Sequence, residues 1–93
     1  LPRKFKLMSN KQKFVPGILG GMGPQATVDF MAKVVDKTDA RCDQEHIQLL
    51  VDHNPRVPNW HEAIAGDSFE VVSVLVAMAQ GLERAGADFL VMV

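Results

Sequence analysis

The sequence predicts an α/β fold in which three parallel strands alternate with helices in the order β-α-β-α-β, and the helices cover the faces of the sheet. Three observations carry this prediction. Residues 14–24 run from an apolar strand through a glycine-rich turn into a helix, strand and helix patterns alternate between turn residues, and residues 88–93 form an apolar run typical of a buried parallel strand. In such sheets ligands bind beyond the carboxyl ends of the strands.

The first strand is expected at residues 14–19, directly before the glycine-rich turn. Gly20, Gly21 and Gly23 have no Cβ, so we expect them to reach positive φ and to let a ligand approach the main chain. Pro24 suits the first position of the helix that follows, because its missing N–H would have been unpaired there. The free amides and positive dipole end of this helix favour an anion, either a phosphate or a substrate carboxylate.

The first helix is predicted from apolar residues at helical spacing after the turn. These residues are Val28, Met31, Val34 and Val35. Lys37 and Arg41 are positive charges of the kind that stabilise a helix C-terminus, so the helix is expected to end near Thr38.

The second strand is predicted over residues 46–53. Asn54 and Pro55 halt it, and a loop follows through Pro58, because prolines cannot serve a central ladder.

The second helix is expected to begin near Asp67 and Glu70, which are spaced three apart as in a capping box. Apolar residues then follow a 4-3-4-3 spacing that favours a helix over a strand, and Gly86 should stop it. The apolar positions are Val71, Leu75, Met78, Leu82 and Ala85.

Composition excludes several classes of protein. The chain has 93 residues, which is about one small domain, and its formal net charge is −1. From position 14 onward it carries five basic and eleven acidic residues, a net charge of −6, which argues against nucleic acid as a partner. The uncharged stretch 71–82 is too short to span a membrane. One cysteine cannot form an internal disulfide, so a reducing, cytoplasmic setting is expected.

The two ends of the sequence differ from the body. Residues 1–13 are basic and weakly patterned, and we expect a disordered leader or a remnant of upstream sequence there; a targeting peptide is the alternative. Residues 14–93 are expected to form the folded part, and since Val93 is an apolar strand residue with no turn after it, we expect this part to be incomplete.

Four motifs resemble the aspartate/glutamate racemase family, in the same order and at the same spacing. They are Gly20-Gly-Met-Gly-Pro-Gln-Ala-Thr27, Asp43-Gln-Glu-His46, Asn54-Pro-Arg-Val-Pro58 and Ala85-Gly-Ala-Asp-Phe-Leu-Val-Met92. The similarity covers about residues 14–92. The first and last motifs are specific in combination, although each alone is weak.

The resemblance implies a cofactor-independent racemase with two pseudo-symmetric α/β lobes, of which this chain would be the amino-terminal one. In that family a cysteine from each lobe flanks the substrate Cα. One thiolate removes the α-proton and the opposite thiol returns a proton to the other face, chemistry that thiols can perform near neutral pH. The expected partner is an acidic amino acid, and a homodimer is a further expectation.

By resemblance, the residues that touch substrate are Met22, Gly23, Asn54 and Thr27. The alternative is that Gly23 only shapes a turn and Asn54 only caps a strand. No catalytic residue is assigned, because the family's motif Met-Pro-Cys-Asn-Thr places the first thiol two residues beyond Met92. A second departure is Trp60, which stands where the family commonly has an arginine for a substrate carboxylate.

Two other motifs give only weak evidence for a nucleotide site or a metal site. Gly21-x-Gly23-x-x-Ala26 fits a dinucleotide fingerprint, but Asp52 comes 31 residues after Gly21 rather than about 20. His61-Glu62 starts like a zinc-protease motif, yet Ala65 replaces the second histidine, so no metal site is predicted.

Three isolated residues, His46, His53 and Cys42, are not predicted to form a site. His46 and His53 should point to opposite faces of one strand and share no metal. Cys42 lies between Arg41 and Asp43, in a polar link away from the expected cleft, and no catalytic role is assigned to it.

The alternative to a racemase is a shortened, non-catalytic relative that acts as a binding or interaction module and self-associates through an exposed sheet edge.

Overall fold

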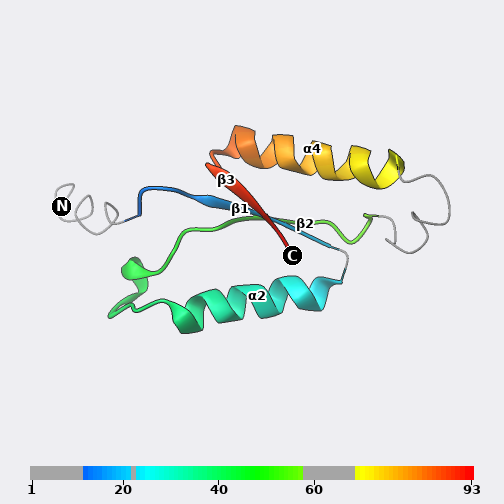
Figure 1. The fold of residues 1–93 in the computed structure, drawn as a ribbon. Coiled ribbons are helices and arrows are strands. Elements are labelled where there is room, and N and C mark those ends of the chain that lie inside the picture. Colours follow the sequence, from blue (N-terminus) through cyan, green and yellow to red (C-terminus); the bar gives the residue numbers. More distant parts are fainter. Residues whose placement is uncertain (1–11, 22, 58–68) are drawn as a thin grey trace.

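A computed structural model describes residues 12–21, 23–57 and 69–93, and these form a parallel sheet between two helices (Figure 1). Its elements, in chain order, are β1 (Pro16–Gly20), α2 (Pro24–Lys37), the 3₁₀ helix η1 (Asp43–Glu45), β2 (Leu50–His53), α4 (Phe69–Ala85) and β3 (Phe89–Met92). The described strands lie in the order β2-β1-β3, and both pairings are parallel. The predicted α/β fold is therefore confirmed.

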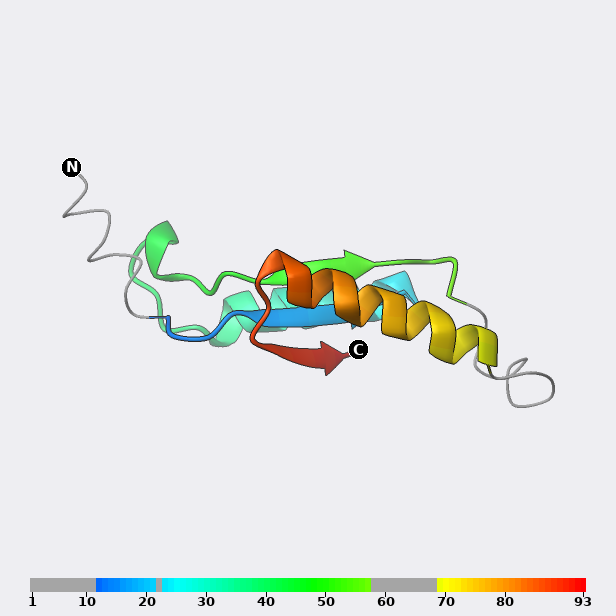
Figure 2. The same ribbon diagram turned by 90° about the horizontal axis from the view of Figure 1, so that it is seen from above.

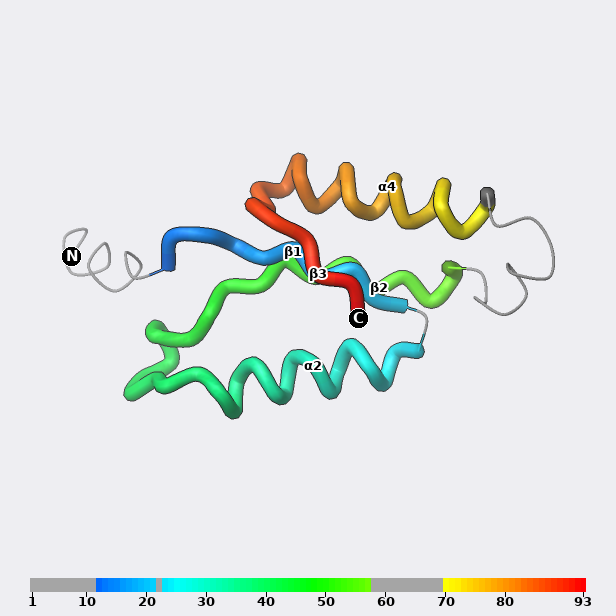
Figure 3. Tube along the Cα trace, viewed as in Figure 1, coloured from blue at the N-terminus to red at the C-terminus, as the bar shows by residue number. Residues whose placement is uncertain are grey.

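The central strand β1 is sandwiched between the two helices. In the register, Leu19 stands opposite Asp52 of β2 and Met92 of β3. The chain crosses from β1 to β2 through α2 on one face, and from β2 to β3 through α4 on the other (Figures 1 and 3). Each helix thus covers one face of the same short sheet.

Most of the core lies between the sheet and α4. Side chains alternate along a strand, so Leu19 faces α4 whereas Ile18, which is fully buried, faces α2. Leu19 packs with Val57, Val71, Met78 and Leu82 in one buried cluster. This cluster holds α4 against the sheet with residues that the 4-3-4-3 spacing placed on one side of the helix.

The packed side of α2 differs from the apolar stripe that predicts the helix. Val28 and Val35 are 59% and 57% exposed, and Met31 is exposed as well. The buried side chain of α2 is Thr27, which faces the end of β1. The helix was predicted correctly from its spacing, but the spacing does not show which side meets the sheet.

Both helices end close to the residues predicted from the sequence. α2 ends at Lys37 and Thr38 caps it, its N–H bonding the carbonyl of Val34 at 3.1 Å. α4 ends before Gly86, whose φ of 111° is the conformation that a C-terminal glycine permits. Asp67, the other half of the expected capping box, lies outside the described residues. No helix in the described part is long and apolar enough to cross a membrane.

The strand boundaries differ from the prediction. β1 starts two residues later and ends one residue later than 14–19, β3 begins at Phe89, and β2 is confined to Leu50–His53 instead of 46–53. Asp88, just before β3, is bonded to the residue before β1: its carboxylate accepts a hydrogen bond from Val15 N (2.7 Å), and its N–H donates to the Val15 carbonyl (2.8 Å).

The late start of β2 has a specific cause in Pro16. Asn54 N donates to the Gly20 carbonyl, so the even-numbered residues of β1 direct their backbone groups at β2. By this register the Gln48 carbonyl would accept from the N–H of residue 16, and proline has none. The ladder therefore stops at Leu50.

The Gln12 side chain makes the hydrogen bonds to Gln48 that a longer β2 would have made with β1. Its Nε2 donates to the Gln48 carbonyl (3.0 Å), and its Oε1 accepts from Gln48 N (2.8 Å). Gln12 lies within the segment expected to be a leader, yet it bonds to the folded part. The side-chain amide of Gln12 thus bonds the backbone carbonyl and N–H of Gln48, which strand pairing with β1 would otherwise engage.

Gln12→Ala is expected to lower the free energy of unfolding by about 1 kcal/mol, because both hydrogen bonds to Gln48 are lost at a partly solvated site. Gln44→Ala is the matched control, since Gln44 is exposed on η1. Urea unfolding of both variants measures the difference. Equal stability of the two would show that the Gln12 bridge contributes nothing.

Candidate functional site

The carboxyl ends of the three strands meet at one edge of the sheet. Asn54, which follows β2, donates its N–H to the Gly20 carbonyl at 2.9 Å, and Val93, which follows β3, donates to the Leu19 carbonyl at 3.0 Å. The end of β1 is therefore flanked on both sides, with α2 starting just beyond it (Figure 2). This is the edge at which ligands bind in parallel sheets.

Gly21 brings the turn after β1 into contact with the end of β2. Its φ is 140°, a region that other residues rarely adopt, and a Cβ built there would overlap the carbonyl of Asn54. Only glycine allows this approach. The sequence singled out Gly21 for its freedom, but its contact with a residue 33 positions later appears only in the fold.

Gly23 is exposed and serves the turn through its conformation alone. Its φ is 120°, and a Cβ there would meet nothing within 4 Å. As the N-cap of α2 it leaves the helix without a side-chain cap, and the first turn contains no acidic residue. Pro24 has no N–H, and the Ala26 N–H donates to the Gly23 carbonyl (3.0 Å). It is therefore the positive dipole end of α2 beside Gly23 that suits an anionic group.

Gly20 has a different role from the expected one. It is the last residue of β1 and its φ is not positive. It must lack a side chain because Thr27 occupies that space: a Cβ on Gly20 would overlap the Thr27 hydroxyl. Thr27 is only 4% exposed, so it lies beneath the turn rather than at its surface, and its Oγ1 has no hydrogen-bond partner among the described residues.

Asn54 forms a turn with its side chain. Its Oδ1 accepts a hydrogen bond from Arg56 N (3.0 Å), and its carbonyl accepts one from Val57 N (3.2 Å). This Asx turn redirects the chain after β2. Among the described residues no hydrogen bond uses Asn54 Nδ2, so that donor is available at the half-buried edge beside Gly20.

Other residues considered in the sequence either lie outside the described residues or lie away from this edge. Met22 and Trp60 lie outside the described residues, as does the segment 61–65. Cys42 is exposed and precedes η1, at the end of the sheet where β2 begins. It is thus on the opposite edge from Gly20 and Asn54.

The prediction that His46 and His53 lie on opposite faces of one strand is wrong, because the two residues do not belong to one strand. His46 caps η1 and lies outside β2, whereas His53 is the last residue of β2. The chain between them is not one strand, because the ladder starts only at Leu50. Within the described ranges there is no group of three His, Cys, Asp or Glu residues that could hold a metal ion.

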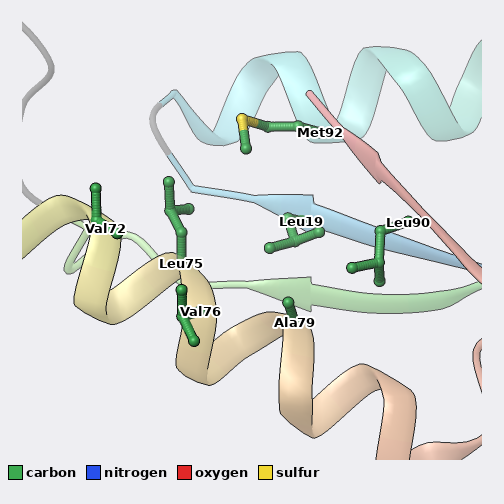
Figure 4. Close-up of a pocket in the computed structure, with 7 residues that line it drawn as sticks. All are labelled: Leu19, Val72, Leu75, Val76, Ala79, Leu90 and Met92. Carbon is green, nitrogen blue, oxygen red and sulfur yellow. The ribbon is translucent and has the colours of Figure 1, made fainter.

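A groove lies on the α4 face of the sheet, and we call it the α4–β3 groove (Figure 4). It has a volume of about 360 Å³, and all of its lining side chains are apolar. From α4 come Val72, Leu75, Val76 and Ala79, and from the sheet come Leu19, Leu90 and Met92. A charged amino acid would find no partner for its carboxylates or ammonium group there, so this groove is not the candidate substrate site.

Residues 19–93 match the family model of Asp/Glu/hydantoin racemases. The chain belongs to this family. A solved structure, that of Picrophilus torridus aspartate racemase, is similar over 87% of the chain with 35% sequence identity and a TM-score of 0.76.

The racemase family membership accounts for the glycine-rich turn better than a dinucleotide fingerprint does, because the match includes the turn and all three strand ends. The chain covers 55% of the Picrophilus protein, so it spans about half the length of that relative. The edge formed by Gly20, Gly21, Gly23 and Asn54 lies within the matched residues.

Proposed function

We propose that this chain forms one lobe of a racemase that inverts the α-carbon of an acidic amino acid, aspartate or glutamate, without a cofactor. The observation that carries the proposal is the family match over residues 19–93, which includes every strand end at the candidate edge. The similarity to an aspartate racemase, at 35% identity, supports the substrate class. A reducing, cytoplasmic setting for this activity rests on the single cysteine.

The candidate edge would bind the charged groups of the substrate. The open N-terminus of α2 beside Gly23 favours a carboxylate, and Asn54 Nδ2 offers a neutral hydrogen-bond donor nearby. Met22 would complete this wall, as the family resemblance implies. Thr27, which packs on Gly20 under the turn, would act by holding the turn in place.

The chemistry we propose is a two-base proton transfer. A thiolate on one side of the substrate removes the α-proton, and a thiol on the other side donates a proton to the opposite face of the resulting carbanion. By the family motif the first thiol stands two residues after Met92. Because Val93 bonds Leu19 at the end of β1, a residue following it would emerge next to the glycine turn.

Cys42 does not fit either role, because it lies at the opposite edge of the sheet. The 93-residue chain contains no other cysteine. We therefore expect it to lack racemase activity on its own, and this expectation separates the lobe from the complete enzyme.

The test is exchange of the α-hydrogen of aspartate and glutamate in deuterated water, with no pyridoxal phosphate added, followed by NMR. The protein produced from the complete gene should exchange at least one of them and form both enantiomers. The same assay on residues 1–93 should give no exchange above buffer. A complete protein that exchanges neither amino acid would refute the racemase proposal.

The second candidate is a non-catalytic module that binds a partner or a second copy of itself. The exposed apolar side chains of β3, Phe89, Leu90 and Met92, favour it, because they lie on an edge strand of the described sheet. Sedimentation of residues 1–93 would support this candidate if a concentration-dependent dimer formed while the complete gene product showed no exchange.

A further inference from the structure

Arg56 places a positive charge at the carboxyl edge of the sheet. It lies in the turn after β2, and its side chain is exposed. Two residues span at most about 7 Å, so Arg56 lies close to Asn54, whose carbonyl lies against Gly21 of the glycine-rich turn. Among the described residues no hydrogen bond or ion pair uses the Arg56 guanidinium, so this group is available to a ligand.

The other described lysines and arginines do not lie at this edge. The strands are parallel and each helix returns the chain, so α2 and α4 end at the opposite edge, where the strands begin (Figure 1). Four cations lie toward that opposite edge: Lys13, Lys37, Arg41 and Arg84. Lys33, in the middle of α2, is paired with Asp29 (2.8 Å). In the described part of the chain, Arg56 is thus the only lysine or arginine beside the candidate site.

The turn holds the Arg56 backbone in a defined position. Its N–H donates to Asn54 Oδ1 (3.0 Å), and the next residue, Val57, donates its N–H to the Asn54 carbonyl (3.2 Å). Val57 is buried in the cluster that contains Leu19, and Pro55 has a fixed φ. A side chain presented from an ordered turn has less freedom to lose on binding, so Arg56 is suited to a specific contact.

His53 is the other side chain at this edge that can carry a positive charge. It is exposed and stands opposite Gly20 in the register. Leu50 packs on the α4 side, so by alternation along β2 the His53 side chain points to the α2 face. An arginine is always charged and can hold a carboxylate with two parallel hydrogen bonds, whereas a neutral imidazole has a single N–H donor. Arg56 is therefore the better partner for a carboxylate.

The strand order β2-β1-β3 indicates which group of the substrate Arg56 would meet. In the proposed reaction the α-carbon lies near the thiol that follows β3, and the positive end of α2 lies beyond β1. Neighbouring strands are about 4.8 Å apart, so the ends of β3 and β2 are separated by about 10 Å. The α-carboxylate is attached to the α-carbon and would stay near β1. The side-chain carboxylate extends farther, and the long Arg56 side chain would reach it from the β2 end.

We propose that Arg56 selects acidic amino acids by binding the side-chain carboxylate of the substrate, while the positive end of α2 binds the α-carboxylate. This inference rests on the proposed racemase function and names the residue that determines its substrate class. Asn54 Nδ2 is a neutral donor, which serves an amide oxygen as well as a carboxylate. The charge of Arg56 favours the carboxylate, so it would distinguish aspartate from asparagine.

The experiment measures binding of aspartate and of asparagine to the complete gene product by calorimetry. Asparagine keeps the α-carboxylate and the ammonium group and has a neutral amide in place of the side-chain carboxylate. Arg56→Gln removes the charge, and Arg56→Lys keeps the charge without the fork of the guanidinium. Arg84→Gln is the matched control, because Arg84 is an exposed arginine at the opposite edge. Circular dichroism and urea unfolding first establish that the variants fold like the parent.

In Arg56→Gln the affinity for aspartate should fall about 10–100-fold, because a hydrogen bond to a charged group is lost, while the affinity for asparagine should change by about twofold or less. Arg56→Lys should recover part of the loss, and Arg84→Gln should bind aspartate like the parent. An equal loss for both amino acids, or no loss for either, would overturn the proposal. A selective loss in His53→Gln with none in Arg56→Gln would assign the contact to His53 and overturn it as well.

Exchange of the α-hydrogen in deuterated water, measured on the same proteins, separates this inference from the proposed function. If the parent binds aspartate selectively through Arg56 but exchanges no α-hydrogen, the racemase proposal fails and the Arg56 contact stands. If the parent exchanges aspartate and Arg56→Gln does so with an unchanged KM, the racemase proposal stands and the role of Arg56 is refuted. A parent that neither binds nor exchanges aspartate would refute both.

Discussion

Gly21→Ala is expected to lower the free energy of unfolding by about 3 kcal/mol or more. Two costs combine at this position. An alanine at a φ of 140° is strained by about 1–3 kcal/mol, and its Cβ would overlap the Asn54 carbonyl, which is backbone and can move only if the end of β2 moves. The turn and the Asn54 segment would separate, so binding at this edge should be lost together with stability.

Gly23→Ala is the matched control, because it carries the conformational cost without the overlap. Its φ of 120° is similarly restricted, but a Cβ there would meet nothing within 4 Å. We expect about half the loss of stability seen for Gly21→Ala, measured by urea unfolding. If the two variants were equally stable, close packing of the turn against Asn54 would not contribute to the fold.

The sequence was sufficient for the features that depend on local chemistry. Pro24 and Gly86 bound their helices as predicted, because a proline at the first position and a glycine after the last one act through their own backbone preferences. The parallel α/β fold followed from the order of these elements. The family resemblance, carried by four motifs, was confirmed by the match over residues 19–93.

Features that depend on pairs of distant residues could not be predicted in the same way. The start of β2 is set by Pro16 and by the Gln12 side chain, which lie more than 30 residues before it. The role of Gly20 is set by Thr27 across the sheet–helix interface, and the role of Gly21 by Asn54. The sequence drew attention to Gly20 and Gly21 but not to Pro16 or Gln12, and the role of all four depends on how distant segments pair in the fold.

The candidate site was likewise predicted only in part from the sequence. The sequence located the glycine turn and Asn54 at one edge, because strand ends in a parallel sheet converge. It could not show that Asn54 Oδ1 is already engaged by Arg56 N, which leaves Nδ2 as the group able to meet a ligand. The structural and the ligand-binding interpretations of Asn54 are therefore compatible, since they use different atoms.

Asn54→Asp separates these two roles. Aspartate keeps an oxygen that can accept from Arg56 N, so the Asx turn should persist and the free energy of unfolding should stay within about 0.5 kcal/mol of the parent. It removes the Nδ2 donor and adds a negative charge where a substrate carboxylate is expected. A hydrogen bond to a charged group contributes about 1.5–3 kcal/mol, so affinity for aspartate should fall roughly 10–100-fold.

The measurement is calorimetric binding of aspartate to the complete protein, with unfolding followed in parallel. Asn54→Ala is the companion variant: it removes the Oδ1 acceptor as well, so it should lose about 1 kcal/mol of stability in addition to affinity. Undiminished affinity in Asn54→Asp, with stability lost only in Asn54→Ala, would confine Asn54 to shaping the turn. The anion-binding role would then rest on the positive dipole end of α2 beside Gly23, which a substitution at position 54 leaves in place.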